Sequence, residues 1–121
     1  MAGLLIHPRR GDVFLVNFAP SVGAEIRKIR PAIVIQNDIA NRLSPITIIA
    51  AITSRSNEKL YPTEVLIKAG EGGLKKDSVI VLDQMRSVDR QRILKKLGKV
   101  SGMTLRRTKR AIMISLGLLE E

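Results

Sequence analysis

The sequence predicts a small, mostly antiparallel barrel or α+β domain with one helix at its C-terminal end. Three observations support this fold class: short β-branched runs are separated by turn signals, an amphipathic stretch follows the last run, and strands do not alternate with helices. With 121 residues, of which 45% are hydrophobic, the chain is long enough for a single domain, residues 1–121, with its own core.

Six runs have the pattern of strands, and they are residues 12–19, 31–36, 46–53, 63–68, 78–88 and 97–100. The second and third, PAIVIQ and ITIIAAIT, are continuously apolar and predict buried strands at the centre of the sheet. The fourth alternates between apolar and polar residues, which suits a half-exposed strand. Between the two buried strands, residues 37–45 (NDIANRLSP) predict a turn or a single helical turn.

The C-terminal stretch predicts a helix over residues 102–118, with Ser101 as its N-cap. On a helical wheel, one face carries Leu105, Thr108, Ala111, Ile112, Ser115, Leu116 and Leu119. The opposite side carries Arg106, Lys109 and Arg110. We therefore expect the helix to pack on the strands and to show a basic outer surface.

The charge of the chain predicts a polyanionic partner. The formal net charge is +10, and ten basic residues between positions 86 and 110 are opposed by Asp89 alone. A solubilising surface is the ordinary explanation of such a run, but an excess this large favours nucleic acid over a membrane surface. Only Phe14, Phe18 and Tyr61 are aromatic, so contacts to phosphates and polar groups are expected rather than a row of stacked bases.

The residue types exclude several kinds of active site. The chain has no cysteine and a single histidine, His7, which excludes thiolate metal sites, cysteine nucleophiles and histidine pairs. The carboxylates are scattered without metal-ligand spacing, so we expect no metal and no cofactor. The GEGG stretch at residues 70–73 lacks the Lys-Ser/Thr of a phosphate-binding P-loop and predicts a turn.

The sequence also predicts a cytoplasmic protein without a membrane partner. The apolar run near the N-terminus, residues 4–6, is too short for the core of a signal peptide. No stretch reaches the length needed to span a membrane.

Arg30 and Thr53 are the residues most suited to a phosphate-directed site. Pro31 disfavours a helical conformation at Arg30, so this arginine begins the second strand, and Thr53 ends the third. If the two strands are antiparallel neighbours, both residues meet at one edge of the sheet, where the planar guanidinium matches two phosphate oxygens. The spacing alone leaves a strand-end salt bridge for Arg30 and a solvated strand end for Thr53 as alternatives.

The segments RGDVFLVNFAP, VGAE, RPAIVIQND, ITIIAAITS, YPTEVLI and DSVIVLDQMRSVDRQRI occur in this order along the chain. Together they resemble the MazF/PemK toxins, the mRNA interferases of bacterial toxin–antitoxin systems, from about Arg10 to Leu118. The resemblance implies an SH3-like small β-barrel with a C-terminal helix that works as a homodimer. Met113 and Ile114, which fall outside the apolar helix stripe, are candidates for the contact with the second subunit.

The resemblance also implies an activity, namely sequence-specific and metal-independent cleavage of single-stranded mRNA. In the family the ribose 2′-hydroxyl attacks the adjacent phosphate and leaves a 2′,3′-cyclic phosphate and a 5′-hydroxyl. The nucleophile then belongs to the substrate, which agrees with a chain that lacks a protein nucleophile, a histidine pair and a metal site. A cognate acidic antitoxin would neutralise the toxin by covering its basic substrate surface.

Carried over by motif, Arg30 is the main catalytic residue and Thr53 the second one. Arg30 would stabilise charge on the pentacoordinate phosphate, because a side chain with a pKa above about 12 is a poor proton shuttle. Glu25 matches the loop glutamate of the family, with a catalytic or loop role. The candidate RNA contacts are Arg27, Lys28, Gln36, Asn37, Ser78, Gln84, Arg86 and Ser87. Where many relatives have a Gln-Gly-Gly-like stretch before Arg-Pro, this chain has a bulkier, more basic one at residues 26–29.

Two other functions fit the same sequence. One is a noncatalytic barrel that binds nucleic acid through the basic surface. The other is a protein-targeting toxin of the kind that poisons gyrase, which shares the barrel. The presence of both Arg30 and Thr53 favours the ribonuclease, and metal-free turnover of RNA would separate it from both.

Overall fold

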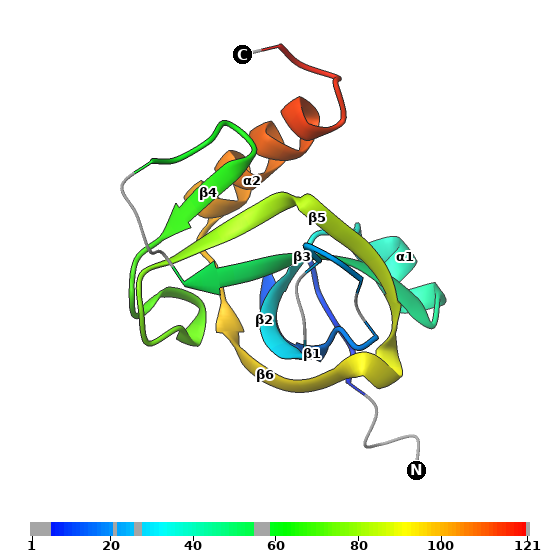
Figure 1. The fold of residues 1–121 in the computed structure, drawn as a ribbon. Coiled ribbons are helices and arrows are strands. Elements are labelled where there is room, and N and C mark those ends of the chain that lie inside the picture. Colours follow the sequence, from blue (N-terminus) through cyan, green and yellow to red (C-terminus); the bar gives the residue numbers. More distant parts are fainter. Residues whose placement is uncertain (1–5, 21, 26–27, 55–58, 121) are drawn as a thin grey trace.

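The computed structural model describes residues 6–20, 22–25, 28–54 and 59–120. Its elements, shown in Figure 1, are β1 (Asp12–Asn17), β2 (Ile29–Val34), α1 (Asp38–Leu43), β3 (Ile46–Ser54), β4 (Glu64–Ile67), η2 (Glu71–Gly73), β5 (Ser78–Asp89), η3 (Arg90–Arg92), β6 (Ile93–Lys99) and α2 (Gly102–Ser115). The 3-10 helices are the two η elements. None of the helices in these ranges is long and apolar enough to cross a membrane.

The strands form one six-stranded antiparallel sheet in the order β4-β5-β3-β2-β1-β6. The predicted antiparallel sheet with a C-terminal helix is therefore confirmed. The sheet is strongly curved, and β5 leads through η3 straight into β6, so that these strands wrap around β1, β2 and β3 (Figure 1). Its edge strands β4 and β6 are not joined in the described ladders, so the expected SH3-like barrel is an open, curled sheet.

An irregularity in β5 accounts for part of the curvature. Ala50 of β3 faces Met85, whereas the next residue, Ala51, faces Val81, so residues 82–84 are extra in β5. Extra residues of this kind bend a strand and re-aim its side chains. In the sequence, this irregularity is visible only as a change within residues 78–88, from a continuous apolar run to an alternation of polar and apolar residues.

Several predicted boundaries were wrong by a few residues. Strand β2 begins at Ile29, before Pro31, because Ile29 pairs with Asn17 of β1. Strand β6 begins at Ile93 rather than at residue 97, because an exposed edge strand can carry lysines and so has no apolar run. Helix α1 is longer than the predicted single turn, and Asn37 begins it by accepting a hydrogen bond from Ala40 N at 2.9 Å.

The core has two parts, because successive residues of a strand point to opposite faces of the sheet. One face, which we call the helix face, carries the cluster that α2 joins through Ala111, and its strand residues include Ile33, Ala50 and Ile80. The other, the inner face, lies inside the curled sheet. Its buried cluster consists of Phe14, Val16, Phe18, Ala32, Val34, Ile49, Ala51, Val88 and Ile93.

Helix α2 has the predicted N-cap and a shorter extent than predicted. Ser101 Oγ accepts a hydrogen bond from Thr104 N at 3.2 Å, which confirms the cap. The helix ends at Ser115, and Gly117 follows with φ 73°, a left-handed conformation common just after a helix. Leu116 therefore lies beyond the helix and is 58% exposed, so its predicted place on the buried face was wrong. Arg106, Lys109 and Arg110 are exposed, as predicted.

Candidate active site

Arg30 and Thr53 lie just beyond the last paired residues of the neighbouring strands β2 and β3. Strands β2 and β3 pair antiparallel, with Ala32 facing Ala51. Moving two residues outward along each strand leads to Arg30 and Thr53, and the period of two keeps both on the inner face. The ladder itself stops at Ala32, since Pro31 has no N–H to donate. The predicted antiparallel neighbourhood of the two strands is thus confirmed.

The Arg30 side chain is exposed and has little local engagement. Its Nη1 donates to the carbonyl oxygen of Ile29 at 3.5 Å, at the outer limit for a hydrogen bond. The salt bridges among the described residues join Lys68 to Asp77 and Lys96 to Asp12. A strand-end salt bridge, the ordinary alternative for Arg30, is therefore not found within the described ranges.

Thr53 is half-buried between neighbouring strands. It faces Val79 of β5, and the next pair outward is Ser54 with Ser78. Ser78, a candidate RNA contact, is buried, and its hydroxyl donates to the carbonyl oxygen of Lys76 at 2.9 Å. A substrate group would have to displace that hydrogen bond to use the Ser78 hydroxyl as a donor.

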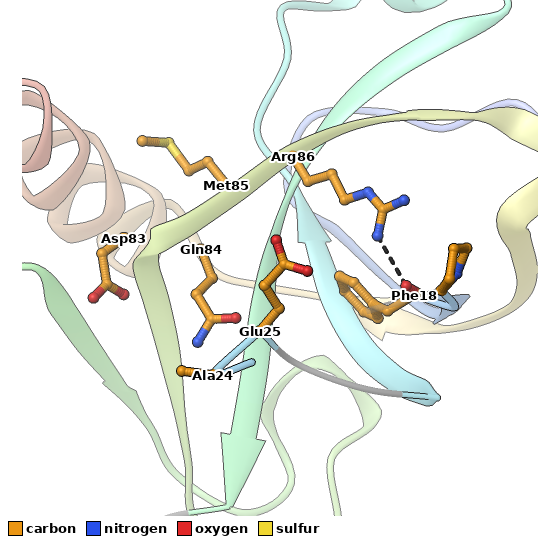
Figure 2. Close-up of a pocket in the computed structure, with 8 residues that line it drawn as sticks. Phe18, Ala24, Glu25, Asp83, Gln84, Met85 and Arg86 are labelled. Atoms are coloured by element: carbon orange, nitrogen blue, oxygen red, sulfur yellow. Dashed lines mark hydrogen bonds between the residues drawn. The ribbon is translucent and has the colours of Figure 1, made fainter. Parts of the chain in front are cut away.

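A pocket of about 660 Å³ opens between the segment that follows β1 and the irregular part of β5. Its walls are Phe18, Pro20, Ala24 and Glu25 on one side and Asp83, Gln84, Met85 and Arg86 on the other. Figure 2 shows Glu25 and Gln84 projecting into this space, with Arg86 reaching across to Phe18. Asp83 and Gln84 belong to the irregular part of β5, and in Figure 2 their side chains leave the strand on opposite sides, with Gln84 on the side of Glu25.

Arg86 connects the two walls of the pocket. Its Nη1 donates to the carbonyl oxygen of Phe18 at 2.9 Å (Figure 2). Arg92 holds the same segment, because its Nη1 donates to the carbonyl oxygens of Asn17, at 3.1 Å, and of Ala19. Within the loop, Glu25 Oε1 accepts a hydrogen bond from Val22 N at 2.7 Å. The root of the loop is thus fixed by charged side chains.

The pocket and the Arg30–Thr53 pair lie on the same face of the sheet. Arg86 faces Ile49 of β3, and Thr53 is four residues further along that strand, on the same side. Four residues of extended chain span about 13 Å. The two features are therefore separate, since neither Arg30 nor Thr53 lines the pocket, but one extended ligand on the inner face could contact both.

Other candidate contacts lie elsewhere. Gln36 and Asn37 follow the far end of β2, about 20 Å from Arg30 along the strand. The Gln36 amide donates to Asn41 Oδ1 at 2.9 Å and to the carbonyl oxygen of Ile46 at 3.0 Å, while Asn37 caps α1. Ser87 is exposed and adjoins Arg86 on β5, so it points to the opposite face. Arg27 lies outside the described residues.

The described residues at the pocket and near Arg30 carry cationic, amide and carboxylate side chains. No group of three or more His, Asp or Glu side chains within the described ranges could hold a metal ion. Carboxylates of Glu25 and Asp83 stand at the pocket, and the cationic residues are Arg30, Lys28 and Arg86.

The model of the PemK-like, MazF-like toxins of type II toxin–antitoxin systems matches residues 9–116 of this chain. The chain belongs to the MazF/PemK toxin family. It is 46% identical over 110 residues to the endoribonuclease MazF of Staphylococcus saprophyticus, covering 91% of this chain and 92% of that protein. It is 42% identical over 112 residues to the endoribonuclease EndoA of Bacillus subtilis strain 168, covering 93% and 97%.

The fold of this MazF/PemK toxin is similar to that of a crystal structure of MazF from Deinococcus radiodurans. The TM-score is 0.78 at 29% sequence identity, with 93% of this chain and 98% of the other covered. The similarity over nearly the whole of both chains confirms the family suggested by the sequence motifs.

The sequence did not point to five of the residues that line the pocket of this MazF/PemK toxin, or to one residue that supports it. The five are Phe18, Pro20, Ala24, Asp83 and Met85, and the support is Arg92 at the root of the loop. Asp83 could have been included because it precedes Gln84 in the motif, and Phe18 because it is one of few aromatic residues. The role of Arg92 could not be recognised in the sequence, because its hydrogen-bond partners are backbone carbonyl groups that lie 73 and 75 residues away along the chain.

Proposed function

We propose that this protein is an endoribonuclease toxin that cuts single-stranded mRNA at a short sequence without a metal ion. The observation that carries the proposal is the antiparallel pairing of β2 with β3, in which Arg30 and Thr53 each stand two residues beyond the last pair, Ala32 with Ala51, and Arg30 is exposed. The endoribonuclease relatives at 42–46% identity support the reaction class. The scarcity of metal-ligating clusters in the described residues is compatible with a reaction that needs only cationic and polar groups.

In the proposed reaction the substrate supplies its own nucleophile. The ribose 2′-oxygen forms a bond to the adjacent phosphorus as it loses its proton, and the bond from phosphorus to the 5′ oxygen breaks. The departing oxygen takes up a proton, so the products are a 2′,3′-cyclic phosphate and a 5′-hydroxyl. DNA lacks the attacking hydroxyl and would not be cut.

Each proposed catalytic residue has one electrostatic task. Arg30 binds the phosphate oxygens, on which negative charge grows in the pentacoordinate state, and strand β2 fixes the position of its backbone. Thr53 donates its hydroxyl to a phosphate oxygen and aligns the group for in-line attack. Glu25 orders the loop beside the site through its hydrogen bond to Val22 N, rather than reaching the phosphate itself.

We expect residues of the pocket to make most of the contacts that recognise bases. Gln84 lies in its wall, and a carboxamide can donate to and accept from a base edge. Arg27 and Lys28 would hold the RNA backbone beside Arg30. Asn37 and Ser87 are proposed as outer contacts. Ser78 is buried and would have to give up its hydrogen bond to the Lys76 carbonyl oxygen before it could donate to RNA. The hydrogen bonds of Gln36 favour a supporting role for that residue.

We further propose an acidic antitoxin, a homodimer and a cytoplasmic location. The matching family is one of toxins of type II toxin–antitoxin systems, and a net charge of +10 would attract an acidic partner. Two-fold symmetry is the commonest closed arrangement of identical chains, and Met113 and Ile114 are only half-buried in this single chain.

The function is tested with matched oligonucleotides in excess EDTA. Total RNA treated briefly with the toxin gives the cleavage sequence by end mapping, and an oligoribonucleotide of that sequence is then compared with one carrying a single 2′-deoxy sugar at the cut. The proposal requires cleavage of the first and none of the second. Cleavage of both, or activity that returns only with Mg²⁺, would contradict it.

A further inference from the structure

The hydroxyl of Ser78 holds the backbone of a nearby lysine. Ser78 is buried, and its Oγ donates to the carbonyl oxygen of Lys76 at 2.9 Å. Ser78 pairs with Ser54, which directly follows Thr53 on β3. The hydrogen bond therefore fixes the backbone of Lys76 at the edge of the sheet where β3 ends and β5 begins (Figure 1).

The turn that carries Lys76 is closed by further hydrogen bonds. Asp77 Oδ1 accepts a hydrogen bond from Ala69 N at 2.9 Å, and Gly70 N donates to the carbonyl oxygen of Leu74 at 2.7 Å. The two ends of the turn are thus tied together. A side chain on such a turn starts from a defined backbone position, which lowers the loss of conformational freedom when it contacts a ligand.

The ammonium group of Lys76 takes part in neither of the salt bridges in the described part of the chain. The carboxylate of its neighbour Asp77 pairs with Lys68, with 3.8 Å between Oδ2 and Nζ, and the other salt bridge joins Lys96 to Asp12. Lys76 is exposed. An exposed ammonium group on a flexible four-carbon stem is suited to binding a phosphate oxygen.

The order of the strands places Lys76 beyond Thr53 when the sheet is followed from Arg30. Strand β3 lies between β2 and β5, and at this edge of the sheet the three strands carry Arg30, Thr53 and Ser78. Lys76 precedes Ser78 by two residues, which is about 7 Å of extended chain. An RNA strand with its scissile phosphate at Arg30 and Thr53 that continues across β3 toward β5 would bring another phosphate to Lys76.

We propose that Lys76 binds an RNA phosphate beside the scissile one, and that Ser78 is a positioning residue that acts on RNA only through the Lys76 backbone. The inference rests on the proposed function in that it takes RNA as the ligand. A contact to a backbone phosphate carries no base information, so Lys76 sets the affinity and the path of the strand rather than the cleavage sequence.

The test is a double-mutant cycle of Ser78→Ala and Lys76→Gln, with Lys76→Arg and Lys75→Gln measured in parallel. Glutamine at position 76 keeps the backbone carbonyl that Ser78 holds, so it removes only the charge. Lys75→Gln is the matched control, because it makes the same change of charge in the same turn, one residue further from Ser78. The probe is a fully 2′-O-methylated single-stranded oligoribonucleotide, which cannot be cut, and its binding is measured between about 50 and 200 mM salt.

Lys76→Gln is expected to bind unrelated probe sequences about fivefold more weakly at about 0.1 M salt. The slope of log affinity against log salt falls in magnitude by roughly 0.7, the value for one phosphate contact to a single strand. Lys76→Arg keeps the parental slope, and Lys75→Gln changes it less than Lys76→Gln does. In cleavage assays Lys76→Gln raises KM and leaves kcat unchanged, since the contact is the same before and during the reaction.

Ser78→Ala is expected to weaken binding in the parent but not in the Lys76→Gln background, because Ser78 acts only through Lys76. A loss that persists in the double variant would make Ser78 a direct RNA contact and overturn its positioning role. A lower denaturation midpoint of Ser78→Ala with unchanged RNA binding would also overturn that role, since it is the result of a purely structural residue.

A parental slope in Lys76→Gln would overturn the phosphate contact. Equal losses in Lys76→Gln and Lys75→Gln would overturn it as well, because the overall charge of the turn would then matter and not the position that Ser78 fixes. The proposed function fails separately: if the parent did not cleave RNA at all, the salt slopes with the uncleavable probe would still decide whether Lys76 contacts a phosphate.

Discussion

Glu71 and Thr104 are joined by a hydrogen bond of 2.6 Å from Thr104 Oγ1 to Glu71 Oε2. The same carboxylate oxygen accepts a hydrogen bond from Ser101 N at 3.0 Å. The Gly-rich turn η2 therefore supplies a second cap to the N-terminus of α2, in addition to the side chain of Ser101. A carboxylate is favoured there because the helix dipole is positive at this end.

Glu71→Gln should destabilise the fold by about 0.3–1 kcal/mol near neutral pH, because the amide oxygen can still accept hydrogen bonds but the negative charge at the N-terminus of the helix is lost. Burial is the largest influence on the Glu71 carboxyl and raises its pKa, but the hydrogen bonds from Thr104 and Ser101 together outweigh it, so the pKa lies below its ordinary value. A lowered pKa stabilises the fold above the unfolded pKa of about 4.3, and this contribution is lost as the pH falls through the folded pKa. Denaturant midpoints of the parent and of Glu71→Gln are measured at pH 7 and below pH 4. The difference between the two proteins should shrink on acidification, and a difference that stays constant would contradict the account.

Gly73→Ala should be strongly destabilising, whereas Gly70→Ala should cost less. Both residues have positive φ, 73° and 100°. A Cβ at Gly73 would lie 2.0 Å from the carbonyl oxygen of Leu97, while one at Gly70 would meet nothing within 4 Å. We expect about 1–2 kcal/mol for the backbone strain alone at Gly70, and more at Gly73, where β6 must also shift. If urea denaturation showed that Gly73→Ala and Gly70→Ala lower the free energy of unfolding by the same amount, the close approach of η2 to β6 would be unimportant.

Arg86→Gln should reduce both stability and activity, because Arg86 ties the Phe18 carbonyl to β5. The half-exposed hydrogen bond contributes roughly 1 kcal/mol, toward the low end for charged groups. Arg106→Gln, on the exposed side of α2, is the matched control and should be neutral in both respects. If Arg86→Gln lost cleavage with an unchanged denaturation midpoint, Arg86 would be a direct RNA contact and not a support of the loop.

The sequence predicted most of the fold because the apolar runs are long and the helix cap is a local signal. The strands at residues 46–53 and the N-cap at Ser101 depend on neighbouring residues only, and both were found. The predicted extent of strand β6 was too short because the exposed positions of the strand carry Lys95 and Lys96, which hide the alternation of apolar and polar residues. The curvature of the sheet was also beyond the sequence, since the extra residues of β5 appear only when β3 is placed beside it.

Some features of the candidate site could likewise be predicted from local signals in the sequence, and others could not. The pairing of the strands that carry Arg30 and Thr53 was predicted from two strand ends and an antiparallel assumption, which local signals can supply, and that pairing was confirmed. The commitment of the Gln36 amide to Asn41 and Ile46 could not be predicted, because it depends on the path of the chain through α1. The role of Arg92 at the loop root was equally hidden, since its partners are backbone atoms far away in sequence.

The most direct measurement is the single-turnover rate of RNA cleavage in EDTA by purified Arg30→Ala, with the parent, Thr53→Val and Arg106→Ala measured in parallel. Because Arg30 is exposed at a strand end, its replacement should leave the denaturation midpoint nearly unchanged. The account predicts a loss of about 10²–10³-fold for Arg30→Ala, a smaller loss for Thr53→Val and none for Arg106→Ala. A folded Arg30→Ala protein that cleaves RNA at the parental rate would contradict it.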